Sequence, residues 1–379
     1  MSAVSNQFTV RVVNPVLPAW LAGAARHQVV VVPGSNLSSP LYASVRATAY
    51  HGSIGNIVDA WGGAFVRDAG SHYGIHGGGH QDYAGNEIYT IRLADDAPAW
   101  VRRWGPTPSG SFANNLSVPF YNDGNPASVH TYFRMFYEPA QDRVLRLGRA
   151  TYASSPVQFP DSDAWLWSDA TETYNTPAPA SPGHWHLAPI ATLPIVATQS
   201  PSFYARDYVS GDLFAVTDTA LHRLPKNASA WVSGPAGVTF RGGPMVFSPS
   251  ANRLIGFNNS ESPQAGRVWV VDFAAGTRAM ALMSGNAGSI AAMSSAGNGS
   301  SFAGAAVDRS SGLIYYCSTG GAIHTLNPVT LEAQPVATTG ASIPTPQYGP
   351  IGRFQFVPEL SGFALLPSWG TSVHFFRTI

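Results

Sequence analysis

A hairpin of two short apolar strands recurs six times along the chain. The first strand of each copy begins near Ala64, Met135, Phe203, Met245, Ala305 or Phe354. A third apolar strand follows each hairpin, over residues 87–93, 163–167, 220–224, 267–273, 322–326 and 372–376, and a weaker fourth strand often comes next. Four antiparallel strands repeated in this way are typical of a β-propeller. We expect an all-β propeller of six four-stranded blades, or of seven if residues 8–60 contain a degenerate blade.

The two ends of the chain are expected to meet in one blade. The sixth copy reaches its third strand at the C-terminus and therefore lacks an outer strand. Residues 8–13 or 27–32, both apolar runs, could supply it, and this pairing would close the ring and remove an open sheet edge. We therefore expect one propeller domain over residues 1–379, in which residues 1–60 provide closing strands and a lead-in and residues 61–379 provide the repeated blades.

Composition narrows the partners that such a ring would bind. The 21 basic and 21 acidic residues balance, so no net field favours nucleic acid or an anionic membrane surface. Since no apolar run is long enough to span a bilayer and no basic head precedes an apolar core at the start, we expect neither a membrane segment nor a signal peptide. A single cysteine, Cys317, excludes an internal disulfide, and its apolar surroundings favour a buried structural thiol.

The most unusual stretch runs from Tyr73 to Leu93 and contains three consecutive glycines, Gly77, Gly78 and Gly79. Such clusters mark positive φ angles or a close approach of another backbone, so at least one positive φ is expected here. The polar loop that follows would then present His80, Asp82 and Tyr83 to a ligand. The alternative is a glycine-rich connection whose polar side chains only bind one another.

This stretch also carries a family resemblance. The segment from Gly62 to Leu93, with Trp100 in the following strand, resembles kelch-type, galactose-oxidase-like β-propellers. Residues 33–38 and 57–61 are similar to uncharacterised propeller proteins of bacterial and phage genomes. The resemblance implies the fold, and it suggests a tail- or capsid-associated protein located in the virion if the gene belongs to a phage, or a cytoplasmic protein otherwise.

One face of the expected propeller carries longer loops than the other. The turns between first and second strands are short, whereas residues 76–85, 106–130, 149–162, 258–266, 284–301 and 340–353 form long connections at the opposite face. Long loops in a compact fold are usually functional. Residues just before the inner strands, Trp61, Tyr132 and Phe302 among them, would lie near the axis there. We predict that the ligand-binding residues of this face are His51, His76, His80, Asp82, Tyr83, His130, Arg134, Arg241, Tyr348 and Arg353.

Arginine forks and aromatic faces suit flat, hydroxylated or carboxylated ligands such as glycans. The favoured function is non-catalytic binding of a glycan or of another virion or host-surface protein. Assembly as a homo-oligomer stays open. The alternative is a lyase that cleaves a uronate-containing polysaccharide by β-elimination, with His80 and Tyr83 moving protons and Arg134 and Arg241 neutralising the carboxylate. His76 and His80 could hold a metal together with His51 or Asp82, but the three glycines between the two histidines do not fix both imidazoles on one side, so no metal or cofactor is predicted.

Overall fold

The computed structural model describes residues 16–46, 52–79, 82–104, 107–108, 121, 128–138, 143–146, 165–167, 186–187, 203–216, 220–226, 228, 230–236, 243–257, 266–295 and 301–379. The strands of these residues form six sheets, and four of the sheets have four strands each in sequence order. These are β2 (Gly63–Arg67), β3 (His72–His76), β4 (Ile88–Arg92) and β5 (Trp100–Trp104); β6 (Met135–Glu138), β7 (Arg143–Arg146), β8 (Trp165–Trp167) and β9 (His186–Leu187); β10 (Phe203–Arg206), β11 (Leu213–Val216), β12 (Ala220–Leu224) and β13 (Val232–Ala236); and β14 (Met245–Ser248), β15 (Arg253–Gly256), β16 (Arg267–Asp272) and β17 (Thr277–Leu282).

The other two sheets each have a fifth, two-residue strand that pairs in parallel with the outer strand. One sheet contains β19 (Gly304–Val307), β20 (Ile314–Cys317), β21 (Ile323–Leu326), β22 (Glu332–Pro335) and β18 (Ser284–Gly285); the other contains β24 (Gln355–Val357), β25 (Gly362–Leu365), β26 (His374–Arg377), β1 (Gln28–Val31) and β23 (Thr339–Gly340). Helical segments are short, as expected for an all-β chain, and none in the described residues is long and apolar enough to cross a membrane. They are α1 (Asn56–Asp59), α2 (Ala287–Ser294), η1 (Pro40–Tyr42), η3 (Ile351–Arg353) and η4 (Pro358–Leu360).

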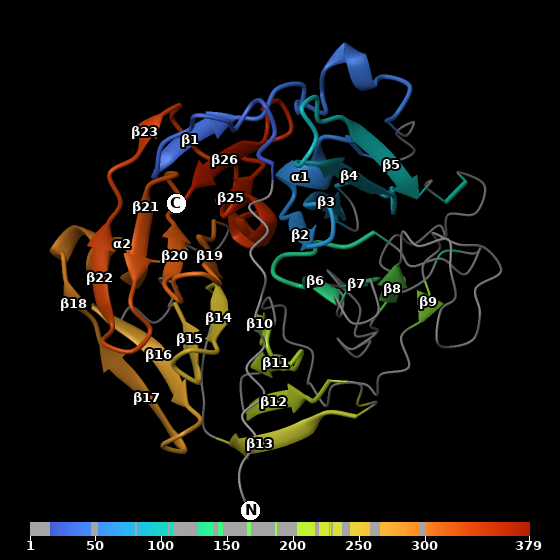
Figure 1. Cartoon of the computed structure of the whole chain (residues 1–379). Coiled ribbons are helices and arrows are strands. Elements are labelled where there is room, and N and C mark those ends of the chain that lie inside the picture. Colours follow the sequence, from blue (N-terminus) through green and yellow to red (C-terminus); the bar gives the residue numbers. More distant parts are fainter. Residues whose placement is uncertain are drawn as a thin grey trace, which may run out of the picture.

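The six sheets follow one another around a central axis, which makes the arrangement a β-propeller (Figure 1). Apolar side chains fill the spaces between neighbouring sheets, because inner strands such as β11, β14, β20 and β25 bury residues on both of their faces. Aromatic pairs illustrate these contacts, for example Phe214 of β11 on Phe247 of β14, with ring centroids 4.9 Å apart, and Tyr315 of β20 on Phe363 of β25, also at 4.9 Å. The hydrophobic core is therefore divided into layers between sheets.

The N-terminal and C-terminal strands pair, as the missing outer strand predicts. β1 lies antiparallel to β26, with Val29 opposite Phe376 and Val31 opposite His374. Of the two candidate runs, residues 27–32 therefore provide the closing strand, and residues 8–13 lie outside the described part. In the described portions of residues 8–60, the chain forms β1, η1 and α1 but no sheet of its own, so the seventh blade that the sequence left open is not found there.

The propeller has a channel along its central axis, and the two ends of this channel carry different kinds of connection. Tight turns join the first to the second strand of a sheet, and an aspartate caps several of them: Asp308 accepts the Ser310 N–H at 2.9 Å, and the Gly312 N–H donates to the Asp308 carbonyl at 2.8 Å. Since the strands are antiparallel, the starts of all first strands lie at the opposite end, together with the loops that follow the second strands. We call these two ends the short-turn end and the long-loop end.

Candidate binding site at the long-loop end

The glycine triplet after β3 has a left-handed backbone throughout, which confirms the expected positive φ. The φ angles are +118° at Gly77, +124° at Gly78 and +83° at Gly79. A Cβ atom on Gly79 would lie 2.1 Å from His130 Nε2 and 2.9 Å from Asp82 Oδ2. Only glycine therefore allows the chain to pass this closely beside the His130–Asp82 pair.

His130 and Asp82 form the polar part of the site. His130 Nε2 lies 2.8 Å from Asp82 Oδ2, and the imidazole is buried while the carboxylate is 39% exposed. The backbone of Asp82 is held in place by α1 and its lead-in, because its carbonyl accepts hydrogen bonds from Asn56 Nδ2 at 2.7 Å and from the Ser53 N–H at 3.1 Å. A fixed carboxylate thus faces solvent at the long-loop end.

A row of aromatic rings continues from His130 in both directions. The indole of Trp61 lies 4.7 Å from the His130 ring and stacks on Tyr348 at 4.4 Å, with 20° between the planes. On the other side, His130 meets Tyr132 edge-on at 5.8 Å, and Tyr132 meets Phe302 at 6.2 Å. Trp61 and Tyr348 are half-buried, whereas the other three rings are buried. We call these five residues and Asp82 the rim cluster.

The backbone of the rim cluster is unusual for bulky residues. Positive φ angles occur at Trp61 (+51°), Tyr132 (+42°), Tyr348 (+56°) and the adjoining Ile351 (+46°). Each such residue costs on the order of 1–3 kcal/mol and persists only where its surroundings enforce it. Hydrogen bonds between sheets provide that enforcement, from the Tyr132 N–H to the Trp61 carbonyl at 3.0 Å and from the Phe302 N–H to the Tyr348 carbonyl at 3.0 Å. Strain of this kind is concentrated at functional sites more often than elsewhere.

Arg353 supports the rim from inside rather than lining it. Its guanidinium is fully buried and donates to the carbonyls of Val58 (2.7 Å), Gly62 (2.9 Å), Leu366 (2.9 Å) and Gly349 (2.7 Å), among others. Burial lowers the pKa of Arg353, while the nearby Tyr73 and Asp59 oppose that shift. A side chain committed to backbone carbonyls in the interior is placed to stabilise the fold, and we leave it out of the binding surface.

His76 is also an interior residue. Its Nδ1 atom lies 3.0 Å from the Glu87 carbonyl and its Nε2 atom 3.1 Å from Arg146 Nη1, which suits a neutral imidazole that donates from Nδ1 and accepts at Nε2. Burial and the Arg146 charge lower the pKa of His76 to about 3. His76 therefore stays neutral and away from solvent.

Tyr83 differs most from its predicted role. The sequence predicts that Tyr83 faces a ligand, but its side chain is fully buried, packs against Gly78 and donates its hydroxyl hydrogen to Glu87. Burial raises the pKa of Glu87, a residue that no motif singles out, because a lone Glu before a strand gives no signal. Arg134 is likewise buried, with its guanidinium 6.0 Å from the Tyr132 ring centroid.

The remaining predicted residues, His51, His80 and Arg241, lie outside the described part of the chain. Of the predicted set, the structure thus brings together Asp82, His130 and Tyr348, and adds Trp61, Tyr132 and Phe302. No group of three or more His, Cys, Asp or Glu side chains in the described residues could hold a metal ion. Cys317 is buried, as expected, and burial raises the pKa of its thiol.

The strand pairing and the rim together define a β-propeller with a candidate binding surface at one end of its channel. No family model matches the chain, and no curated protein matches it. Solved structures with a similar shape include YCF48 bound to a D1 peptide (10% identity, 96% of this chain and 100% of that chain, TM-score 0.43) and a chain of the mitotic checkpoint complex (9%, 100% and 96%, TM-score 0.48). A third is a protein of unknown function from Bacteroides thetaiotaomicron (12%, 80% and 84%, TM-score 0.38).

Proposed function

We propose that the six sheets are the six blades of a single propeller domain and that this domain is a non-catalytic binding protein. The binding surface is the rim cluster. The observation that carries this proposal is the strained backbone at Trp61, Tyr132 and Tyr348, which fixes a row of aromatic rings beside the partly exposed carboxylate of Asp82. Folding stability alone gives no reason to retain this strain.

The partner is a polypeptide segment that presents a basic side chain. Tryptophan and tyrosine are enriched at the energetic centres of protein interfaces, since they bury a large area with few rotatable bonds. A carboxylate beside aromatic rings adds an ion pair and cation–π attraction for Arg or Lys. The buried His130 supports this role by holding the Asp82 carboxylate in one position.

The test is binding to an immobilised peptide library that contains Arg, Lys and neutral residues at otherwise matched positions. Asp82→Asn should weaken binding of basic peptides by roughly tenfold or more, because a charge-assisted hydrogen bond is lost. Trp61→Ala should reduce binding of all peptides that the parent selects. The matched control is Val209→Ser, which changes an exposed residue at the short-turn end and should leave binding unchanged.

Two results would contradict the proposal. One is equal selection of basic and neutral peptides by the parent protein. The other is loss of binding in Val209→Ser with no effect of Asp82→Asn or Trp61→Ala, since that pattern would place the partner at the short-turn end.

A glycan is the second candidate partner, because aromatic rings also stack on sugar rings and a carboxylate accepts hydrogen bonds from hydroxyl groups. A glycan array with the same three variants separates the two. The kelch-like relation and a virion role come from the sequence resemblance only, and neighbouring tail or capsid genes would support them. We do not propose the lyase, because the Tyr83 hydroxyl is buried and donated to Glu87.

A further inference from the structure

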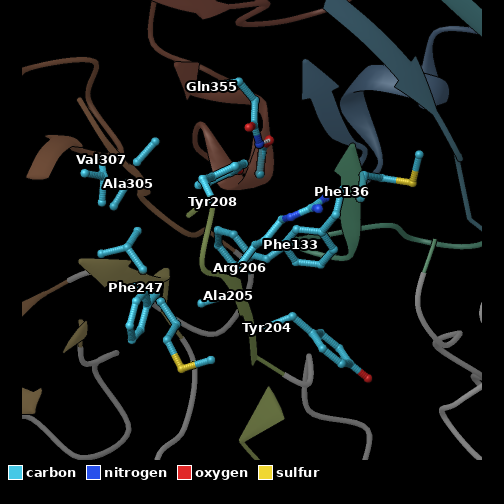
Figure 2. Close-up of a pocket in the computed structure, with 15 residues that line it drawn as sticks. Phe133, Phe136, Tyr204, Ala205, Arg206, Tyr208, Phe247, Ala305, Val307 and Gln355 are labelled. Atoms are coloured by element: carbon cyan, nitrogen blue, oxygen red, sulfur yellow. Dashed lines mark hydrogen bonds between the residues drawn. The ribbon is translucent and has the colours of Figure 1, made fainter. Parts of the chain in front are cut away.

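A cavity lies inside the channel, separate from the rim cluster. Its volume is about 60 Å³, and strands from five of the six sheets contribute to its wall. The lining is mostly apolar and aromatic and includes Phe133, Phe136, Tyr204, Phe247 and Ala305 (Figure 2). Apolar cavities with a few polar groups are the usual form of small-molecule sites.

Two of the lining residues, Arg206 and Gln355, carry nitrogen donors. Arg206, the last residue of β10, is only 5% exposed, and its side chain extends among the residues drawn in Figure 2. The carboxamide of Gln355 is oriented by hydrogen bonds from its Nε2 atom to the carbonyls of Gly352 (2.7 Å) and Ala64 (3.2 Å). A guanidinium in an apolar cavity favours an anionic group, because the low dielectric strengthens their attraction.

The short-turn end of the channel is crossed by a contact among three sheets. Arg309, in the turn after β19, places its guanidinium carbon 3.9 Å from the ring centroid of Tyr208, in the turn after β10. The same guanidinium binds Asp68, in the turn after β2, at 2.7 Å. Asp68 therefore pairs with Arg309, and Tyr208 also meets Arg206, whose guanidinium carbon lies 5.9 Å from the ring centroid.

We propose that this cavity binds a short-chain organic carboxylate, with the carboxylate at Arg206 and the hydrocarbon part against Phe133, Phe136 and Phe247. A volume of about 60 Å³ accommodates roughly four water molecules, which is comparable with a carboxylate of two or three carbon atoms. The planar fork of arginine binds both carboxylate oxygens at once. This site is independent of the rim cluster.

The experiment is a ligand-observed NMR titration of the full-length protein with acetate and propionate, compared with the isosteric neutral amides acetamide and propionamide. We expect the parent protein to bind propionate with a dissociation constant in the millimolar range or tighter, and at least about tenfold more tightly than propionamide. Equal binding of the acid and the amide would overturn the assignment of the anion to Arg206, and no binding of either would overturn the site.

Variants locate the site. Arg206→Gln should weaken propionate binding at least about tenfold, and Ala305→Leu, which fills the cavity without altering Arg206, should abolish it. The control is Arg223→Gln in β12, two strands away in the same sheet. The Arg223 side chain is 54% exposed, and this variant should bind propionate as the parent does. Propionate binding that survives both cavity variants would contradict the proposal. If Arg206→Gln fails to fold, Ala305→Leu and the acid–amide comparison decide. Asp82→Asn should not change propionate affinity, which separates this test from that of the proposed function.

Discussion

Gly79 and Gly23 share almost the same backbone angle but differ in their surroundings. Their φ values are +83° and +82°, and an added Cβ atom would overlap His130 at Gly79 but would meet no atom within 4 Å at Gly23. The pair therefore separates two costs of replacing a glycine. One is the steric cost of the left-handed region itself, and the other is the loss of space for a neighbouring side chain.

Alanine substitutions at both glycines test this distinction. Gly23→Ala should lower the free energy of unfolding by about 1 kcal/mol, which is the cost of a Cβ atom at positive φ. Gly79→Ala should lower it further and should also weaken binding at the rim, because His130 and Asp82 must move. Urea denaturation of both variants measures the difference. Equal losses of stability would show that the close approach at Gly79 contributes nothing.

The buried His76 predicts a pH dependence of stability. Its pKa of about 3 in the folded protein lies below the ordinary value of 6.5. Between these values the unfolded chain binds the proton and the folded protein does not. The stabilisation is therefore complete above pH 6.5 and is lost as the pH falls from 6.5 toward 3, by up to about 1.4 kcal/mol per pH unit.

His76→Gln removes this titration and should flatten the curve of unfolding free energy against pH over that window. Burial also lowers the pKa values of His222, His324 and His374, and these residues remain in both proteins, so the difference between the curves isolates His76. Parallel curves for parent and variant would mean that His76 is protonated in the folded protein.

At the scale of elements, deletion of β1 is the change that we expect to lower stability most. It covers the edge of β26 and contributes Val29, a buried member of the core between β20 and β25. Deleting residues 1–32 should expose both the edge and this apolar layer, so the protein should aggregate or melt well below the parent. The control deletion of residues 1–13 keeps β1 and should melt close to the parent. A melting temperature unchanged by the longer deletion would contradict closure by β1.

The elements were predictable from sequence because their pattern is local. The hairpins, the third strands and the outer strand at Trp100–Trp104 follow from apolar runs and turn residues within a few positions. The site was less predictable because it depends on contacts between sheets. Sequence placed Tyr83 and Arg353 at the surface, but Tyr83 fills the space beside Gly78 and Arg353 bonds carbonyls that lie up to 295 positions away. No short-range pattern encodes either contact.

At the scale of the whole molecule, buried or half-buried arginines connect sheets at both ends of the channel. Arg353 joins the segment before β2 to the segment after β25 near the long-loop end. Arg309 joins the turns after β2, β10 and β19 at the short-turn end. Since a planar guanidinium can donate to several acceptors at once, one side chain can hold several blades in position. The ring is thus fixed at both ends by polar contacts and between its sheets by apolar layers.

The pairing of β1 with β26 also sets an order of events during synthesis. β1 is the first described strand to leave the ribosome. Its residue Val30 pairs with Phe375 of β26, which follows 345 positions later. In contrast, the first and second strands of each sheet are separated by only a few residues, so these hairpins are able to form as they emerge. The last sheet therefore closes only after β26 has been synthesised, and until then β1 carries an unpaired edge that is open to neighbouring chains.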